Sequence, residues 1–287
     1  MSRCRNDRAG GAQRVTKIRL VVSDVDGTLV RSDKSLSDAV VAAAERLRAA
    51  GVHFSLISAR PPSGICWIAE RLGLRGQIGA FNGGTILEPD GTILSAVTLD
   101  PSVAAHTLDA LDAAGVDIWL FADGNWYALT EDNPRVPREK LSSNVDPVIV
   151  SDLRPLTGRA DKIVGVSEDE SLMARLERDL AAALGLRAHV ARSQPYFLDV
   201  TAPAANKGDG VAALAAAAGV ALEEVAVLGD QRNDLPMFAR AGLSIAMGQA
   251  PDEVRAAADQ VTLPNDEDGV AYAIDTLLLG GDGAARR

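Results

Sequence analysis

The sequence of 287 residues is poor in cysteine, in aromatic side chains and in long apolar runs. Its two cysteines, Cys4 and Cys66, are too few for a disulfide framework in a chain of this length, and they favour a reducing, cytoplasmic setting. No stretch approaches the roughly 20 apolar residues that a membrane-spanning helix needs. The sequence therefore predicts neither a disulfide-stabilised secreted protein nor a membrane protein.

The chain also has fewer basic than acidic side chains, 29 against 39, which gives a net charge of −10. Nucleic acids and anionic membranes both require a basic surface, so this balance argues against either partner. A small phosphorylated ligand remains compatible, because a metal ion and a few donors can reverse the field at one site. The first residues are locally basic with no apolar stretch after them, and we predict a disordered tail over 1–17 rather than a signal peptide.

Segments with strand and helix spacing alternate at both ends of the chain. The expected strands are 18–23, 52–57, 78–81, 225–228, 243–246 and 261–263, and the expected helices are 36–50, 62–73, 207–218, 233–241, 252–258 and 269–279. This alternation predicts an α/β fold in which a Rossmann-like parallel sheet carries crossover helices. We assign this domain to residues 18–86 together with 201–287.

The middle of the chain has a different pattern. A helix over 103–114 precedes two strand-like segments, 117–122 and 126–130, joined by the hairpin signal Asp123-Gly124-Asn125. A polar loop with Pro134 and Pro137 follows, and then come further strands around a helix that ends at residue 184. The sequence therefore predicts a separate α+β domain, inserted over residues 87–200.

We expect four polar segments each to follow a predicted strand, at the end of the sheet where ligands bind in open α/β folds. They are Asp24-Val25-Asp26-Gly27-Thr28, Ile57-Ser58-Ala59-Arg60, Asn206-Lys207-Gly208 and Gly229-Asp230-Gln231-Arg232-Asn233-Asp234. Several carboxylates at one point repel each other unless a cation is present, and a set of hard oxygen ligands suits Mg²⁺. Lys207 adds a positive charge for a phosphate, and Ser58 adds a hydrogen-bond donor. We therefore expect a magnesium-dependent phosphate site.

These segments resemble motifs I to IV of the haloacid dehalogenase superfamily of phosphotransferases, in the family's order. Asn82-Gly83-Gly84 and Ala246-Met247-Gly248 resemble segments of its Cof-like subfamily of small-metabolite phosphatases. The inserted domain matches that subfamily's cap in position, and the resemblance covers residues 18–279. Two departures, Ala59 and Gln231, concern only the local backbone.

The resemblance implies a role for each matching residue. Asp24 would be the nucleophile that becomes an aspartyl-phosphate, and Asp26 would protonate the leaving oxygen and then activate water. Mg²⁺ would be held by Asp24, the backbone carbonyl of Asp26, and Asp230, with Asp234 as a further partner. The phosphoryl oxygens would be held by Ser58, Lys207 and Asn233, and a substrate loop would contain Asn82 and Gly83.

The resemblance thus implies a Mg²⁺-dependent phosphomonoester hydrolase acting on a small phosphorylated metabolite, such as a sugar phosphate. A phosphomutase of the same superfamily is the alternative enzyme, because it shares the first half-reaction. A receiver-like signalling domain is the alternative without enzymatic activity. Asp26 argues against it, since a base poised to activate water would shorten the life of a signalling phospho-aspartate. Substrate and oligomeric state are not encoded in the motifs.

Each of three features has two possible interpretations. Ser58 can cap a helix or contact a ligand, and Arg60 can be an ion-pair partner or a substrate contact. With aromatic residues at only 4% of the chain, a cluster of four within nine residues stands out. The cluster consists of Trp119, Phe121, Trp126 and Tyr127. It either packs the inserted domain or covers the leaving group of the substrate.

Overall fold

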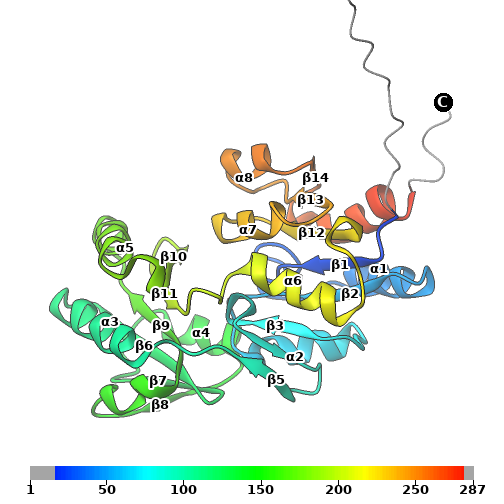
Figure 1. Cartoon of the computed structure of the whole chain (residues 1–287). Coiled ribbons are helices and arrows are strands. Elements are labelled where there is room, and N and C mark those ends of the chain that lie inside the picture. The colour runs from blue at the N-terminus through cyan, green and yellow to red at the C-terminus, as the bar shows by residue number, and fades with distance from the viewer. Residues whose placement is uncertain (1–16, 281–287) are drawn as a thin grey trace, which may run out of the picture.

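The computed structural model describes residues 17–280 (Figure 1). Apart from Lys17, the tail predicted over residues 1–17 lies outside the described part, as does Cys4, while Cys66 is a free thiol. Among the described helices, none combines the length and the apolar character needed to cross a membrane.

A five-stranded sheet, parallel throughout, forms the centre of the first domain. Its order is β14-β13-β12-β1-β2, with bounds β14 Gln260–Val261, β13 Leu243–Ala246, β12 Val225–Gly229, β1 Leu20–Ser23 and β2 His53–Leu56. Leu20 of β1 lies between Val225 and His53, so strands from both ends of the chain are direct neighbours. The predicted parallel α/β sheet is confirmed.

Helices cover both faces of this sheet because its strands are apolar on both sides. Val21 packs into a cluster with α1 (Asp38–Ala49), α2 (Pro62–Arg71) and α9 (Gly269–Tyr272). Its neighbours Leu20 and Val22 point the other way, toward α6 (Lys207–Ala217), α7 (Leu235–Phe238) and α8 (Asp252–Ala257). Packing on both faces leaves the carboxyl edge of the sheet for the loops that carry the polar motifs.

The strand predicted over 78–81 does not extend the parallel sheet as expected. β3 (Ile78–Ala80) pairs antiparallel with β4 (Thr85–Leu87), which pairs antiparallel with β5 (Ile93–Ala96). Only one parallel bridge, between Ile57 and Gly79, connects β3 to the strand before it. The short turn after β3 reverses the chain at Asn82 and Gly83, both at positive φ, and this reversal favours an antiparallel partner.

The helix predicted over 233–241 is also shorter than expected. Residues Arg232–Asp234 form a 3₁₀ turn, and α7 spans only Leu235–Phe238. The carboxylate of Asp234 accepts the backbone N–H groups of Asp230 and Gln231, which holds this segment as a compact loop. A side chain that binds the preceding backbone competes with helix formation.

The inserted segment forms a six-stranded sheet of its own, in the order β10-β11-β9-β6-β7-β8. The bounds are β10 His189–Gln194, β11 Phe197–Thr201, β9 Ala160–Val166, β6 Asp117–Ala122, β7 Asn125–Ala128 and β8 Pro147–Ile149. Helices α3 (Pro101–Ala113) and α5 (Glu170–Leu184) pack against one face through Leu120 and Ile163. We call this unit, with α4 described below, the cap. Its division from the first domain at residues 87 and 200 stays a prediction, and β5 lies in the sheet with β3 and β4.

The opposite face of the cap sheet is turned toward the first domain. Trp119, Phe121 and Val164 belong to the same hydrophobic cluster as Val21 and Phe81 of that domain. The helix α4 (Val136–Ser143) lies in the segment that the sequence predicted as a polar loop. Pro137, which indicated a loop in the sequence, occupies the first turn of α4. A backbone N–H at this position has no partner within the helix, so its absence removes no helical hydrogen bond. Figure 1 shows α4 between the cap sheet and the first domain.

Candidate active site

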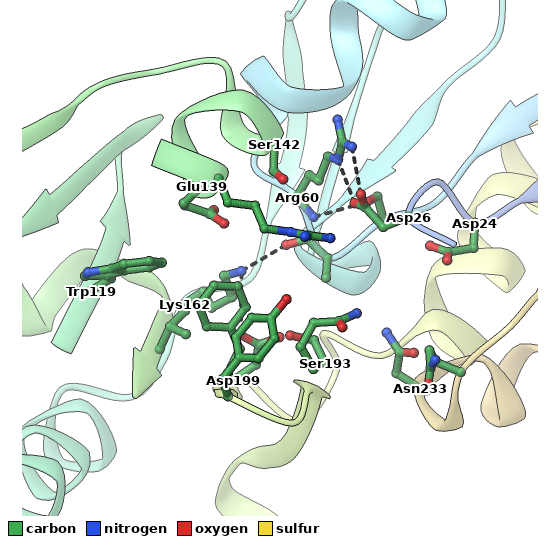
Figure 2. A pocket seen from close by; sticks show the side chains of 18 of the residues that line it. Asp24, Asp26, Arg60, Trp119, Glu139, Ser142, Lys162, Ser193, Asp199 and Asn233 are labelled. Atoms are coloured by element: carbon green, nitrogen blue, oxygen red, sulfur yellow. Dashed lines mark hydrogen bonds and ion pairs between the residues drawn. The ribbon is translucent and has the colours of Figure 1, made fainter. Parts of the chain in front are cut away.

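A pocket opens between the carboxyl edge of the parallel sheet and the inner face of the cap (Figure 2). The first domain contributes Asp24 and Asp26 from the loop after β1, Ser58 from the loop after β2 and Asn233 from the loop after β12. These loops meet because β2, β1 and β12 are adjacent strands. Lys207, Asp230 and Asp234 lie buried beside them. The expected convergence of the four motifs is observed.

Lys207 joins two of these carboxylates directly. Its Nζ lies 2.6 Å from Asp24 Oδ1 and 2.6 Å from Asp234 Oδ1, and its side chain is 1% exposed. Burial would lower the pKa of Lys207, but the charges of Asp234 and Asp24 outweigh burial and raise it. Lys207 is therefore a permanent cation, placed within hydrogen-bond reach of the Asp24 carboxylate.

The carboxylates of Asp24, Asp230 and Asp234 offer oxygens within 4.8 Å of one another. Burial raises the pKa of Asp24 to about 7, although the positive charge of Lys207 acts in the opposite direction. The pKa of Asp230 is raised well above its usual range by burial and by the charges of Asp24 and Asp234. A divalent cation bound by these carboxylate oxygens would offset the repulsion between their charges. Gly27 leaves room for the Asp230 carboxylate, because a Cβ there would lie 2.3 Å from Asp230 Oδ2. The residues present therefore fit a divalent cation.

Asp234 is less available than its two neighbours. One oxygen is bound by Lys207 and the other by the backbone N–H groups of Asp230 and Gln231 at 2.8 and 2.9 Å. Asp230 is bound more loosely, accepting a hydrogen bond from Thr28 at 3.0 Å and one from Gln231 at 3.3 Å. Asp234 therefore holds Lys207 and the loop, and the assignment of the metal ligands stays a prediction.

Asp26 is held by two cations. Arg60 donates to both of its oxygens, Nε at 2.6 Å and Nη2 at 2.7 Å, and Lys34 Nζ donates at 2.5 Å. Burial alone would raise the pKa of Asp26, but the hydrogen bonds and charges of Arg60 and Lys34 outweigh burial and lower it well below the usual range. In this arrangement Asp26 is ionised, and its pairing with Arg60 and Lys34 opposes the uptake of a proton. Donating one requires these bonds to weaken first.

The loop after β2 decides part of the ambiguity at Ser58 and Arg60, and contact of either residue with substrate stays a prediction. Helix α2 begins at Pro62 and its N-cap is Pro61, so the helix-cap interpretation of Ser58 is wrong. The hydroxyl of Ser58 accepts the N–H of Arg60 at 3.2 Å and lines the pocket, where its own proton is free for a ligand. Arg60 is the ion-pair partner of Asp26, as one of its two interpretations held.

Asn82 and Gly83 contribute mainly to packing. Gly83 lies against α6, since a Cβ on it would be 2.6 Å from the Cα of Gly210. This close approach holds the helix that begins with Lys207. Asn82 accepts a hydrogen bond from Asn233 at 3.3 Å and so contacts a residue of the pocket wall. Their direct contact with substrate stays a prediction.

Sequence reasoning missed the residues that the cap contributes to the pocket. Glu139 comes from α4, Lys162 from β9 and Asp199 from β11, and all three face the pocket in Figure 2. Lys162 Nζ donates to the backbone carbonyl of Ala59 at 3.0 Å, so the cap sheet touches the loop that carries Ser58 and Arg60. The sequence signal for Lys162 and Asp199 was a charged residue within an apolar strand, whereas Glu139 lay in the segment predicted as a polar loop.

The aromatic cluster is chiefly core. Trp119, Phe121 and Trp126 are at most 2% exposed, with ring centroids 4.8 Å apart for the two tryptophans and 6.2 Å apart for Phe121 and Trp126. Tyr127 is half-buried beside the other face of the cap sheet. Of the four, only Trp119 lines the pocket. The packing interpretation therefore holds for three of them.

We expect Trp126→Ala to destabilise the protein rather than change its substrate ranking. Removing a fully buried tryptophan leaves a cavity that typically costs about 3–5 kcal/mol. The measurement is the free energy of unfolding, with Tyr127→Ala on the same strand as a milder, half-buried control. A change in substrate ranking with no loss of stability would contradict the packing role.

A parallel α/β sheet with four polar motifs at its carboxyl edge, a lysine between buried carboxylates and a cap over the pocket defines a class of phosphoryl-transfer enzymes. Comparison with known proteins identifies the family. The model of the haloacid dehalogenase-like hydrolase family matches residues 21–274. The chain belongs to this family, and the predicted resemblance to Cof-like phosphatases is confirmed.

Individual proteins that are similar to this chain support the same family assignment. A phosphatase of Bacillus subtilis is 27% identical over 290 residues, covering 91% of this chain and 100% of the relative. The HMP-PP phosphatase of Cronobacter sakazakii is 27% identical over 238 residues, covering 83% and 87%. A crystal structure of a haloacid dehalogenase-like hydrolase from Bacteroides thetaiotaomicron has a TM-score of 0.81 and 31% identity, covering 91% of this chain and 100% of that one. The chain is a phosphatase of this family.

Proposed function

We propose that this phosphatase is a Mg²⁺-dependent phosphomonoester hydrolase that acts on a small phosphorylated metabolite through an aspartyl-phosphate intermediate. The observation that carries the proposal is the placement of Asp24, which lies 2.6 Å from Lys207 and within 4.8 Å of the Asp230 carboxylate. Two anions, a carboxylate and a phosphate, meet only where positive charge offsets their repulsion.

In the proposed reaction, a carboxylate oxygen of Asp24 attacks phosphorus and the bond from phosphorus to the ester oxygen breaks. Asp26 must first take up a proton as its bonds to Arg60 and Lys34 weaken, and it then passes this proton to the leaving oxygen. It later regains a proton from the water that cleaves the aspartyl-phosphate. Lys207, Ser58 and Asn233 hold the phosphoryl oxygens. The ion would be held by Asp24, Asp230 and the backbone carbonyl of Asp26, and when bound it supplies the remaining positive charge.

Arg60 and Lys34 fit this sequence of events as positioning residues. Their hydrogen bonds fix both oxygens of Asp26 at the rim of the pocket. They also keep the carboxylate ionised, so their bonds must weaken whenever Asp26 carries a proton during the reaction.

We expect chelation to abolish phosphate release and Mg²⁺ to restore it, with Ca²⁺ a poor substitute. Ca²⁺ takes more ligands at longer distances, so it draws on carboxylate oxygens that must stay free for attack. The measurement is phosphate release from p-nitrophenyl phosphate after dialysis against chelator, with each metal added back separately. Full activity in chelator, or equal activity with Ca²⁺, contradicts the metal requirement.

The experiment that tests the function as a whole is a phosphate-release screen with Mg²⁺ over sugar phosphates, nucleotides and phosphorylated cofactors. The screen includes HMP-PP, the substrate in the name of the Cronobacter relative, because that relative is similar to this chain. Turnover of at least one metabolite well above that of the aryl phosphate supports the proposal. Release that depends on an added bisphosphate activator indicates the mutase instead.

A further inference from the structure

The cap side of the pocket contains a buried carboxylate oxygen without a partner. Asp199 on β11 is 4% exposed, and its Oδ2 is a buried side-chain atom that receives no hydrogen bond from the described residues. Glu139 on α4 faces the same space (Figure 2). Burial raises the pKa of Glu139 to about 7, with the charge of Asp199 adding to the effect and that of Lys162 opposing it. Neither carboxylate is used by the mechanism above.

The neighbouring cations are committed elsewhere. Lys162 Nζ donates to the carbonyl of Ala59, lies 4.8 Å from the ring centroid of Phe121, and approaches Asp199 only at Oδ1, 3.7 Å away. Arg60 and Lys34 are bound to Asp26. Arg138, the other cation on the pocket wall, is an exposed residue of α4.

A buried acceptor that lacks a donor is costly, and the cost is relieved by a ligand that brings one. Asp199 and Glu139 lie on the cap, across the pocket from Asp24, where the part of the substrate beyond the phosphate must lie. Acceptors in this position match hydroxyl groups, which donate. A purely apolar leaving group would leave Asp199 Oδ2 without a donor.

We propose that Asp199 and Glu139 determine specificity by accepting hydrogen bonds from hydroxyl groups of the leaving alcohol, so that the enzyme selects monophosphates of uncharged, polyhydroxylated alcohols. The inference rests on the proposed function, since it concerns the alcohol side of the same pocket. It assigns these two residues to recognition and gives them no part in phosphoryl transfer.

The test compares mannitol phosphate with hexyl phosphate, two six-carbon esters that differ in their hydroxyl groups. We expect the native enzyme to have the higher kcat/KM for mannitol phosphate. The assays are run at a pH above the raised pKa of Glu139, so that this side chain is ionised. In Asp199→Asn and in Glu139→Gln, the ratio of the two kcat/KM values is expected to fall about tenfold, since a charged acceptor binds hydroxyl donors more strongly than a neutral one. The exposed Asp179→Asn on α5 removes a cap carboxylate outside the pocket and should keep the native ratio.

Each other outcome has a defined meaning. Absence of phosphate release from p-nitrophenyl phosphate by the native enzyme overturns the proposed function and the inference together. Hydrolysis of that ester with an equal ratio in the native enzyme, or with the native ratio in every folded variant, overturns the inference alone and assigns water as the partner of Asp199. A preference for mannitol bisphosphate over mannitol phosphate also overturns it, because Lys162 and Arg138 would then receive a second anion.

Discussion

Asp24→Asn is expected to abolish turnover, with a loss on the order of 10⁴- to 10⁶-fold in kcat, as for other nucleophiles that act within a concerted set. An amide cannot accept the phosphoryl group, and no other carboxylate replaces it. Asp230 and Asp234 lie beside it, but Asp234 is bound on both oxygens and Asp230 is held by Thr28. The measurement is phosphate release by purified protein in Mg²⁺.

The same variant should remain folded. The asparagine oxygen can still accept from Lys207, and one negative charge leaves a cluster in which Asp24, Asp230 and Asp234 share a single lysine. We therefore expect a Tm equal to or above that of the native protein in the absence of metal. Asp33→Asn, which alters an exposed carboxylate in the same segment, is the matched control for activity. Substantial turnover by folded Asp24→Asn refutes the assignment of the nucleophile.

Asp26→Asn is expected to lower kcat for an alkyl phosphate by about 10²- to 10⁴-fold, the usual contribution of a positioned acid and base. The asparagine removes the group that exchanges protons but keeps the nucleophile and the backbone carbonyl. An aryl phosphate has a good leaving group, so its phosphorylation step should be relatively spared. Single-turnover rates for hexyl phosphate and p-nitrophenyl phosphate measure the difference.

The structure adds a second readout for Asp26. Arg60 is 4% exposed, and its guanidinium makes two hydrogen bonds to Asp26, so the neutral amide leaves a buried cation without its counter-charge. We expect Asp26→Asn to be less stable than Asp24→Asn for this reason. Equal losses for the alkyl and the aryl ester in the single-turnover assay would assign Asp26 to positioning alone.

The sequence was sufficient to predict the parallel sheet and the convergence of its polar loops. Both follow from local patterns, because β1 and β12 are apolar runs that end directly at the motifs, and the carboxyl ends of adjacent parallel strands share an edge. The pairing of β3 was not predictable in this way. It depends on a tight turn at Asn82 and Gly83, whose two positive φ angles redirect the chain.

The cap side of the pocket was beyond sequence reasoning for a different reason. Glu139, Lys162 and Asp199 are separated by tens of residues and carry no motif, and they meet only once the cap sheet is assembled. Helix α4 was hidden by Pro137, which reads as a loop signal although it fits the first turn of a helix. Recognition of the alcohol thus depends on tertiary packing, whereas the catalytic motifs lie in short segments of chain.

The contact between Lys162 and the Ala59 carbonyl links these two parts of the molecule. Ala59 stands between Ser58, which faces the pocket, and Arg60, which fixes Asp26. Any displacement of the cap sheet therefore acts on the segment that aligns the proton-transferring carboxylate. By thermodynamic linkage, an alcohol that stabilises the cap in the position with the Lys162–Ala59 hydrogen bond also stabilises the orientation of Asp26 that goes with it. Binding of the alcohol and placement of the proton-transferring carboxylate are then energetically coupled.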